Sequence, residues 1–375
     1  MNFDFSDEQK QIRDQARRFL SEKCTTRMVR KLYENANGFD AELWRQVAQM
    51  GWIGTAIPES FGGLGLGYLE LCVVAEELGR SLAPLPFVST IYLFAEALLA
   101  AGSDAQKTRL LPGVAAGDVI GCLARAEGPG AVTPKSIRAS FRAGRLSGVK
   151  TAVADGMEAR YAVVVARCSD EAGERGLQLA LADLEGAGVK RRRLASIDPS
   201  RGLAEISFDN APAEALGAPG EGWRIAEAVM DRAAILAAFE QVGGADACLA
   251  MAKDYATTRY AFGRPIGSFQ AIKHKLADMY VLNELARSNA YYGAWALSTN
   301  ARELPLAAAA ARVCATQAFD YAAKENIQTH GGIGFTWEAD CHFYYKRARE
   351  LGLVLGPQRV WKDKLVGELE RSNAA

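Results

Sequence analysis

The sequence is poor in histidine, has no closely spaced cysteines and carries no excess of charge. Its three histidines are His274, His330 and His342, and their spacing matches no zinc-binding pattern. The seven cysteines are odd in number and include no C-x-x-C pair, which indicates reduced thiols rather than a disulfide framework. We therefore expect neither a metal site nor structural disulfides.

The balance of charge also excludes classes of partner. Lys plus Arg and Asp plus Glu both number 44, whereas a general nucleic-acid binder shows a basic excess. The one basic run, 190–193, is expected to be a solvated loop. The N-terminal stretch MNFDFSDEQK is acidic and lacks the apolar core of a signal peptide, and no apolar run approaches membrane-spanning length. These features predict a cytoplasmic protein that binds neither nucleic acid nor membrane.

The N-terminal region, residues 1–120, has the pattern of a helical domain. The chain of 375 residues is long enough for two or three domains with buried cores. Ser6 and Gln9 form a capping box, and apolar residues then recur at helical spacing. Further helices are predicted near 43–50 and 68–78, and the second of these is stopped by the prolines that follow it.

The pattern changes after residue 120. Residues 121–213 contain short β-rich runs separated by Gly, Asp and Pro, as in a small antiparallel barrel or sandwich. Residues 214–375 are Ala-rich and helical, which predicts a four-helix bundle. We therefore expect an α+β protein with an N-terminal helical domain, a middle β-domain and a C-terminal helical bundle. The predicted strands are 145–153, 161–166, 177–182 and 205–208.

Two segments of the last region have the composition of a diphosphate-binding site. The first, RYAFGRPIGSFQAIKHKLADM at 259–279, joins an arginine, a tight turn and a new amphipathic helix. The second, QTHGGIGF at 328–335, places paired glycines where a backbone comes close to another group. An arginine supplies charge, and a glycine-rich turn supplies free N–H groups without side chains in the way.

Together, these segments resemble the FAD-binding signatures of the acyl-CoA dehydrogenase family, and the resemblance extends over almost the whole chain. It implies the fold described above and the cofactor FAD. It also implies a reaction in which an acyl-CoA thioester loses a proton from Cα to a carboxylate and a hydride from Cβ to the flavin. Electron-transfer flavoprotein is the expected acceptor, and the family forms dimers and tetramers through the bundle.

The resemblance assigns seven residues to the binding of FAD. In the family, the bundle signatures clamp the pyrophosphate and adenine half of the FAD that belongs to a neighbouring subunit. Each residue also has a plain structural alternative, since Arg259 could be a helix C-cap cation and the phenylalanines could be core. The matching positions here are Arg259, Phe262, Phe269, Gln270, Gln328, Gly331 and Gly332.

The flavin-ring side of the family site is not matched. Members usually carry a Thr-Glu-Pro-Gly-type turn at the start of the β-domain, where this chain has CLARAEGPG with Ala124 and Arg125. A second segment usually places a Trp and a Thr or Ser against the ring, where this chain has GVKTAVADG with Ala152 and Ala154. The expected aromatic wall and hydroxyl donor are therefore missing.

The usual catalytic glutamate is also missing. The family places it just before a glycine near the C-terminus, which here is Leu355, or 26 residues before the motif arginine, which here is Ala233. Asp231 is the remaining catalytic candidate, but two residues are about 200° around a helix, so it is expected to face elsewhere as a surface or helix-start charge. Glu240 is another carboxylate on the same predicted helix.

These observations leave open three functional hypotheses. The chain could be the FAD-clamping subunit of a heteromeric acyl-CoA dehydrogenase, resembling the shorter subunits of such bacterial enzymes in steroid side-chain degradation. It could instead be a homomeric acyl-CoA dehydrogenase with an atypical base. A related flavin oxidase or monooxygenase is a third possibility, although it would still need ring contacts. The one-sided pattern of losses favours the first hypothesis. Across the hypotheses, the expected partners are an acyl-CoA substrate and a homologue with which the chain forms a homo- or hetero-oligomer.

Overall fold

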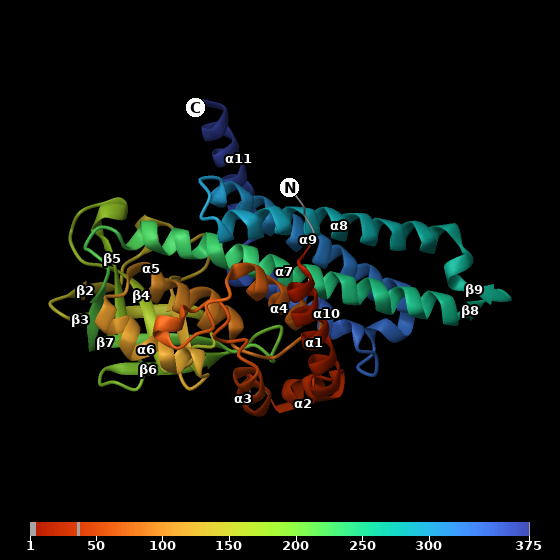
Figure 1. The fold of residues 1–375 in the computed structure, drawn as a ribbon, viewed down its shortest axis with the longest axis horizontal. Coiled ribbons are helices and arrows are strands. Elements are labelled where there is room, and N and C mark those ends of the chain that lie inside the picture. The colour runs from red at the N-terminus through yellow and green to blue at the C-terminus, as the bar shows by residue number, and fades with distance from the viewer. Residues whose placement is uncertain (1–4, 36–37, 375) are drawn as a thin grey trace. The chain divides into compact units, whose positions relative to one another are not determined.

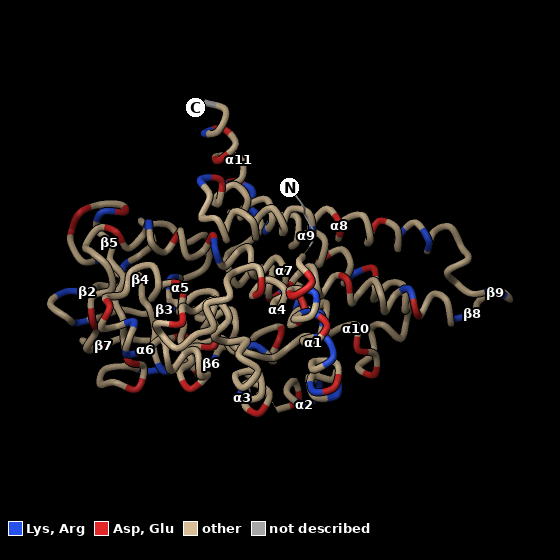
Figure 2. Tube along the Cα trace, in the orientation of Figure 1, with Lys and Arg blue, Asp and Glu red and all other residues tan. Residues whose placement is uncertain are grey.

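The computed structural model describes residues 5–35 and 38–374, and its elements follow the predicted order of helices, then strands, then helices (Figure 1). The predicted α+β fold class is therefore confirmed. The start of the N-terminal stretch for which no signal peptide is expected lies outside the described residues. Lys and Arg are interspersed with Asp and Glu along the chain (Figure 2).

The N-terminal helices are α1 (Asp7–Lys23), α2 (Thr26–Asn35), α3 (Ala41–Gln49), α4 (Tyr68–Arg80), a π-helical stretch (Val88–Ala95), α5 (Glu96–Ala101) and α6 (Asp104–Ala115). The strands of the sheet are β1 (Gly121–Ala124), β2 (Ser140–Arg142), β3 (Arg145–Ala154), β4 (Tyr161–Arg167), β5 (Leu177–Asp183), β6 (Val189–Leu194) and β7 (Leu203–Leu216). The C-terminal elements are α7 (Gly222–Thr258), β8 (Tyr260–Ala261), β9 (Arg264–Pro265), α8 (Gln270–Ser298), α9 (Leu304–His330), α10 (Cys341–Val354) and α11 (Gln358–Ala374).

The chain forms two compact units that each combine distant segments. Unit 1 contains Met1–Lys31, Tyr68–Ala83 and Ala234–Ala375, and unit 2 contains Leu32–Gly67 and Pro84–Ala233. The strands of the sheet all lie in unit 2, as the predicted middle domain requires. These two compact units group the helices differently from the three domains predicted from the sequence. The predicted domain boundaries at 120 and 213 therefore stay a prediction.

Local sequence signals set the ends of the predicted helices. Ser6 caps α1 through its side chain, and Gln9 completes the capping box, as predicted. The helix predicted at 68–78 is α4, which continues to Arg80. Inside the helices, tertiary packing also restricts which residue types fit, most clearly where α4 crosses α7.

In unit 1, α4 and α7 touch backbone to backbone through two glycines. A Cβ atom on Gly79 would lie 1.9 Å from the carbonyl oxygen of Glu240 in α7, and one on Gly243 would lie 1.9 Å from the carbonyl oxygen of Glu76 in α4. No side chain larger than hydrogen fits at these distances. The two glycines therefore fix how closely and in which register the two helices cross.

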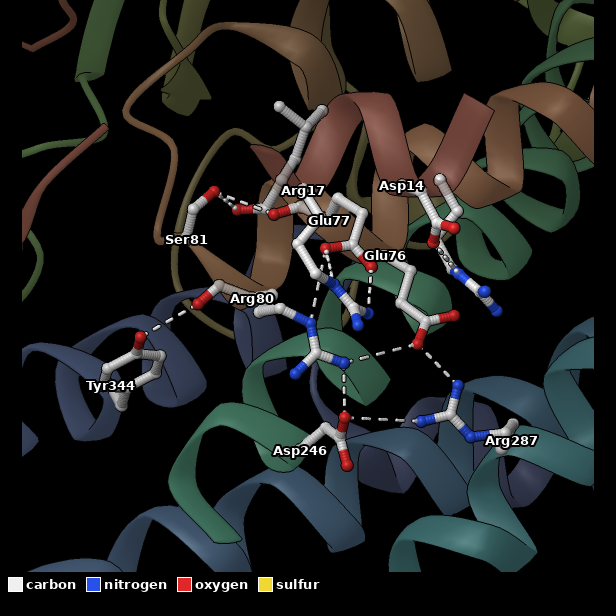
Figure 3. Close-up of polar contacts among 11 residues, drawn as sticks. Asp14, Arg17, Glu76, Glu77, Arg80, Ser81, Asp246, Arg287 and Tyr344 are labelled. Atoms are coloured by element: carbon white, nitrogen blue, oxygen red, sulfur yellow. Dashed lines mark hydrogen bonds and ion pairs between the residues drawn. The ribbon is translucent and has the colours of Figure 1, made fainter. Parts of the chain in front are cut away.

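Charged side chains surround this crossing (Figure 3). Glu76 and Glu77 of α4 are both buried. Arg17 of α1 donates two hydrogen bonds to Glu77, at 2.7 and 3.0 Å, and Arg287 of α8 donates one to Glu76 at 2.5 Å. Arg80 pairs with Asp246 of α7. The buried carboxylates are thus compensated by arginines from three helices of unit 1.

The sheet of unit 2 closes on itself. Strands β4, β2, β3, β7 and β5 pair in turn, and β5 pairs again with β4. Of the two predicted forms, this ring of strands is a barrel. Most of its pairings are antiparallel, as expected, but β4 pairs with β1 and β2 in parallel. Its interior is filled by apolar side chains such as Val164, Ile206 and Phe208.

Two expectations from the sequence are wrong. The basic run 190–193 is not a loop, because it lies in β6, which pairs with β7. Its arginines are engaged within unit 2: Arg191 donates to backbone carbonyls, Arg192 pairs with Glu205 and Arg193 with Glu158. In addition, α7 is long and apolar enough to cross a membrane, but 78% of its most apolar window is buried inside the protein, as in a core helix.

Unit 2 also buries an aspartate. Asp155 accepts a hydrogen bond from the hydroxyl of Ser89 at 2.6 Å and one from the backbone N–H of Gly202 at 3.3 Å. Burial raises the pKa of Asp155 to about 6, against the opposing effects of Arg201 and Ser89. The folded chain therefore holds a proton on Asp155 at pH values where the unfolded chain has released it.

The helix crossing predicts the effect of adding one methyl group. Gly79→Ala or Gly243→Ala should lower the free energy of unfolding by at least about 2–3 kcal/mol, because the new Cβ would overlap backbone that cannot move independently. Gly352→Ala in α10 is the matched control, since its nearest contact would be an ordinary 3.6 Å. Urea unfolding measures all three, and equal stability of Gly79→Ala and Gly352→Ala would contradict the crossing.

The buried aspartate predicts a pH dependence. Because the pKa is 3.8 in the unfolded reference and about 6 in the fold, stability that is present below about pH 4 is lost as the pH rises to 6. The free energy of unfolding, measured relative to that of Asp155→Asn, should therefore fall over this range and level off above it. A difference that stays constant from pH 4 to pH 7 would show that Asp155 titrates normally.

Candidate functional site

The two signature segments lie at one end of the helical bundle of unit 1 (Figure 1). Tyr255 near the end of α7 stacks on His330 at the end of α9, with ring centroids 4.3 Å apart. Lys275 in the first turns of α8 pairs with Glu325 of α9 at 2.7 Å. These contacts bring together the end of α7, the β8–β9 hairpin, the start of α8 and the glycine turn after α9.

The hairpin presents an aromatic side chain at its tip. Phe262 and Gly263 link Ala261 to Arg264 and both have positive φ, at 53° and 77°, as a two-residue type I′ turn requires. Phe262 is 95% exposed, so the alternative that it is a core residue is wrong. Its ring meets that of Phe269 edge-on at 6.3 Å, and the guanidinium of Arg264 lies 4.1 Å from the centre of the Phe269 ring.

Three polar residues of the signatures have unused hydrogen-bonding groups. Arg259, Gln270 and Gln328 are exposed. Among the residues that the structure describes, none of their side chains forms a hydrogen bond or an ion pair. The position of Arg259 after α7 suits a cation at a helix C-terminus, but its side chain makes no capping bond within the described chain. The charge and donors expected to hold a diphosphate are therefore available to a ligand.

The paired glycines leave the backbone accessible. Gly331 has φ of 64° and ψ of −139°, a conformation that side chains rarely adopt. Gly332 has no such strain, and a Cβ there would meet nothing within 4 Å. Nothing within the described chain therefore requires glycine at 332, whereas close approach of an outside group would. The residues of this end, which we call the clamp (Arg259, Phe262, Phe269, Gln270, Gln328, Gly331 and Gly332), fit the anionic and aromatic half of FAD.

The two segments of the missing ring contacts are neighbours in unit 2. Thr151 donates its backbone N–H to the carbonyl of Ala126 at 2.8 Å, and Lys150 donates to the carbonyl of Arg125 at 3.2 Å. The expected juxtaposition is thus present, but Ala124 is fully buried and offers no hydroxyl. The side chains present do not fit the ring as the family signatures describe it.

Within this turn, Arg125 forms an ion pair and a cation–π contact with residues of α7. Arg125 pairs with Glu227 at 2.6 Å, and its guanidinium lies 5.2 Å from the centre of the Trp223 ring. Burial lowers the pKa of Arg125, against the opposing effects of Glu227 and Asp231. Because residues at i, i+4 and i+8 share one face of a helix, Trp223, Glu227 and Asp231 form a single face of α7 toward Arg125. Their spacing is visible in the sequence, but their common partner is not.

Lys150 completes this polar cluster. Its ammonium is fully buried and pairs with Glu127 at 2.6 Å. Glu127 also accepts hydrogen bonds from the backbone N–H groups of Arg138 and Ala139, at 2.7 and 3.0 Å. Burial lowers the pKa of Lys150 to about 8, although Glu127 acts in the opposite direction. The buried cations of the ring-side segments are therefore both paired with carboxylates of this chain.

The first position of the family base is sealed in the bundle of unit 1. Leu355 is buried, and its carbonyl accepts a hydrogen bond from the indole N–H of Trp361 at 3.0 Å. One turn earlier, the buried Arg312 donates to the carbonyl of Leu351, which caps the end of α10. Sequence reasoning did not identify Arg312 or Trp361. A leucine in this setting cannot accept a proton.

Asp231 and Glu240, two carboxylates on the same predicted helix as the second base position, are both buried. Ala233, at the second family position, is fully buried. Asp231 is also buried, so its prediction as a surface charge is wrong, and it acts electrostatically on Arg125. Glu240 is fully buried and acts on Arg312, whose pKa burial lowers to about 10.

Comparison with known proteins agrees with this architecture. Residues 6–118 match the N-terminal domain model of acyl-CoA dehydrogenases, and residues 220–366 match the C-terminal domain model. The chain is 33% identical to acyl-CoA dehydrogenase IpdE2 of Mycobacterium tuberculosis, over 98% of both chains.

Two solved structures are also similar. One, described as a variant of the Tcur3481-Tcur3483 steroid ACAD, has a TM-score of 0.88 and 30% identity, covering 98% of this chain and 99% of that one. The other, the ChsE4-ChsE5 complex from Mycobacterium tuberculosis, has a TM-score of 0.89 and 27% identity, covering 99% of both. Members of the matched family are FAD-dependent oxidoreductases that act on CH–CH bonds. The chain belongs to the acyl-CoA dehydrogenase family.

Proposed function

We propose that this chain is the FAD-clamping subunit of a heteromeric acyl-CoA dehydrogenase. One observation carries the proposal: the clamp retains accessible, unused polar groups, whereas the ring-side turn and both base positions are closed by other side chains. Independent drift would weaken all parts of the site alike. A one-sided loss is what a subunit needs when it grips the FAD of its neighbour and performs no chemistry itself.

Each clamp residue has a definite role in this proposal. Arg259 would pair with the diphosphate of FAD, and the accessible backbone of Gly331 and Gly332 would approach it without steric hindrance. Gln270 and Gln328 would donate or accept hydrogen bonds beside it. The exposed ring of Phe262 would cover the adenine. When bound, FAD supplies the hydride acceptor for the oxidation of a CH–CH bond, and the proton would be taken by a carboxylate of the partner.

The similar proteins support a heteromeric assembly. Two of the similar structures are named for pairs of chains, Tcur3481-Tcur3483 and ChsE4-ChsE5, and the first is called a steroid ACAD. We infer that this chain assembles with an acyl-CoA dehydrogenase homologue that carries the ring contacts and the glutamate. The substrate would be an acyl-CoA, with a steroid-derived acyl group as one class to test. The electron acceptor would be electron-transfer flavoprotein.

The first test concerns Arg259. Arg259→Ala should weaken FAD binding by the assembled enzyme about ten- to hundred-fold, which corresponds to roughly 1.5–3 kcal/mol for a charge-assisted contact. Thermal stability of the chain should not change, because the Arg259 side chain has no partner among the described residues. Lys253→Ala, which removes an exposed cation near the end of α7, is the matched control and should leave FAD affinity unchanged. Unchanged FAD affinity together with a lower melting temperature would instead make Arg259 a structural cap.

The second test concerns the base. The isolated chain should not oxidise acyl-CoA thioesters with an artificial electron acceptor. In the complete assembly, Asp231→Asn should keep its rate within about twofold, whereas loss of a true base costs roughly 10²–10⁴-fold. Circular dichroism checks that the variant is folded. Turnover by the isolated chain that Asp231→Asn abolishes would make Asp231 the base and would refute the proposed role.

A further inference from the structure

Arg264, which is outside the seven clamp residues, is a second arginine of the β8–β9 hairpin at the end of unit 1 (Figure 1). Like Arg259 it is exposed, and among the described residues its side chain has no hydrogen-bond or ion-pair partner. From residue 259 to residue 277 the sequence contains no Asp or Glu that could neutralise either charge locally. The positive charge of both arginines is therefore available to an anion from outside the described chain.

The pairing of the hairpin places the two arginines on one face. Ala261 pairs with Arg264, and the N–H of Ile266 donates to the carbonyl of Arg259 at 2.8 Å, so that Arg259 lies opposite Ile266. Side chains alternate between the two faces of a strand, so these four residues share a face. Diagonal neighbours on one face of an antiparallel pair are about 7–8 Å apart. Two arginine side chains from such positions can reach the same small anion.

Phe269 holds the guanidinium of Arg264 without using its hydrogen-bond donors. The central carbon of the guanidinium lies over the Phe269 ring, 4.1 Å from the ring centre. Stacking occupies the flat face of a guanidinium and leaves the N–H groups at its edge free. The exposed ring of Phe262 meets Phe269 edge-on in the same cluster. A guanidinium fixed in this way offers paired donors that match the oxygens of a phosphate group.

The turn that brings the two arginines together is a costly one. Phe262 has φ of 53°, a conformation for which type I′ turns favour Asn or Gly. Two like charges on neighbouring strands also destabilise their pairing. An anion bound between Arg259 and Arg264 would remove this repulsion. The hairpin thus has the charge, the donors and the geometry of a site for an anion with two phosphate groups.

We propose that Arg259 and Arg264 together bind the diphosphate of an adenine nucleotide, one guanidinium to each phosphate group. Phe269 is then the positioning residue that orients Arg264. A diphosphate carries negative charge on both phosphate groups, so a single arginine would leave one of them unpaired. This role of Arg264 rests on the proposed function, because it takes the clamp as the site. Since the clamp residues grip only the adenine and diphosphate half of FAD in that function, the isolated chain should also bind free ADP.

Calorimetric titration of the full chain with ADP tests the two-arginine site. Arg264→Ala should weaken ADP binding about ten- to hundred-fold, as expected for the loss of one charge-assisted contact. Arg302→Ala is the matched control and should leave the affinity unchanged. Arg302 is also exposed and has no partner among the described residues, but it lies beyond the far end of α8, about 40 Å from the hairpin. Equal ADP affinities of Arg264→Ala and the wild type would overturn the proposal.

Arg264→Lys separates the charge of this side chain from its packing. Lysine keeps the positive charge but has neither the flat face nor the fork of donors. The variant should recover part of the ADP affinity that is lost in Arg264→Ala. Its ADP binding should also be more sensitive to added NaCl than that of Arg264→Ala, because salt screens charge. Equal affinities and equal salt dependences of the two variants would reduce Arg264 to a packing residue and overturn the proposal.

Arg259→Ala distinguishes a failure of this proposal from a failure of the clamp. If Arg259→Ala weakens ADP binding and Arg264→Ala does not, the clamp stands and Arg264 is not part of it. If neither variant changes the affinity, or if the wild-type chain binds no ADP at millimolar concentration, the two-arginine site and the clamp are both wrong. The melting temperature of each variant should match that of the wild type, which checks that the variants are folded.

Discussion

The crossing of α4 and α7 through Gly79 and Gly243 is the constraint on which unit 1 depends. Backbones that meet without intervening side chains leave one register for the two helices, and that register buries Glu76 and Glu77. Buried carboxylates are tolerated only when they are paired. Helices α1 and α8 must therefore pack where Arg17 reaches Glu77 and Arg287 reaches Glu76. Although burial acts against its charge, Glu76 and Asp246 raise the pKa of Arg287 on balance. The position of α8, and with it the start of the clamp, follows from this network.

The clamp and the ring-side turn differ in how their polar groups are satisfied. At the clamp, Arg259, Gln270 and Gln328 are exposed and have no partner within the described chain. At the ring-side turn, Arg125 and Lys150 are buried and paired with Glu227 and Glu127. A group that awaits a ligand stays accessible at little cost, whereas a buried charge must be neutralised by its own chain. This contrast is the physical basis for assigning the chain one half of a composite site.

Several helices and strands could be predicted from the sequence, because the residues that start and end them lie within or next to the elements themselves. The Ser6–Gln9 capping box, the extent of α4 and four of the strands follow from caps, periodicity and turn residues. The basic run 190–193 was misread as a loop because its strand is an outer one whose arginines are satisfied by partners far along the chain. Asp231 was misread as a surface charge for the same reason. Asp231 is buried and acts electrostatically on Arg125, and no spacing rule links residues from a strand end and a distant helix.

The composition of the clamp was recognisable because a long signature is specific where single residues are not. Its availability to a ligand was not recognisable, since exposure and the absence of partners are properties of the fold. Likewise, the loss of the base at Leu355 could be read from the sequence, but its sealing by Trp361 and Arg312 could not. Sequence thus identified the residues of the clamp, and the structure shows that the ring-side turn and both base positions are filled by this chain's own side chains.

The central claim is that this chain contributes half of a composite FAD site, and flavin stoichiometry tests it most directly. The measurement is the ratio of FAD absorbance to protein for the purified chain alone and for its complex with the homologous partner. The account predicts little or no FAD on the isolated chain and about one FAD for each pair of unlike chains. An isolated chain that purifies with one FAD per polypeptide would contradict it.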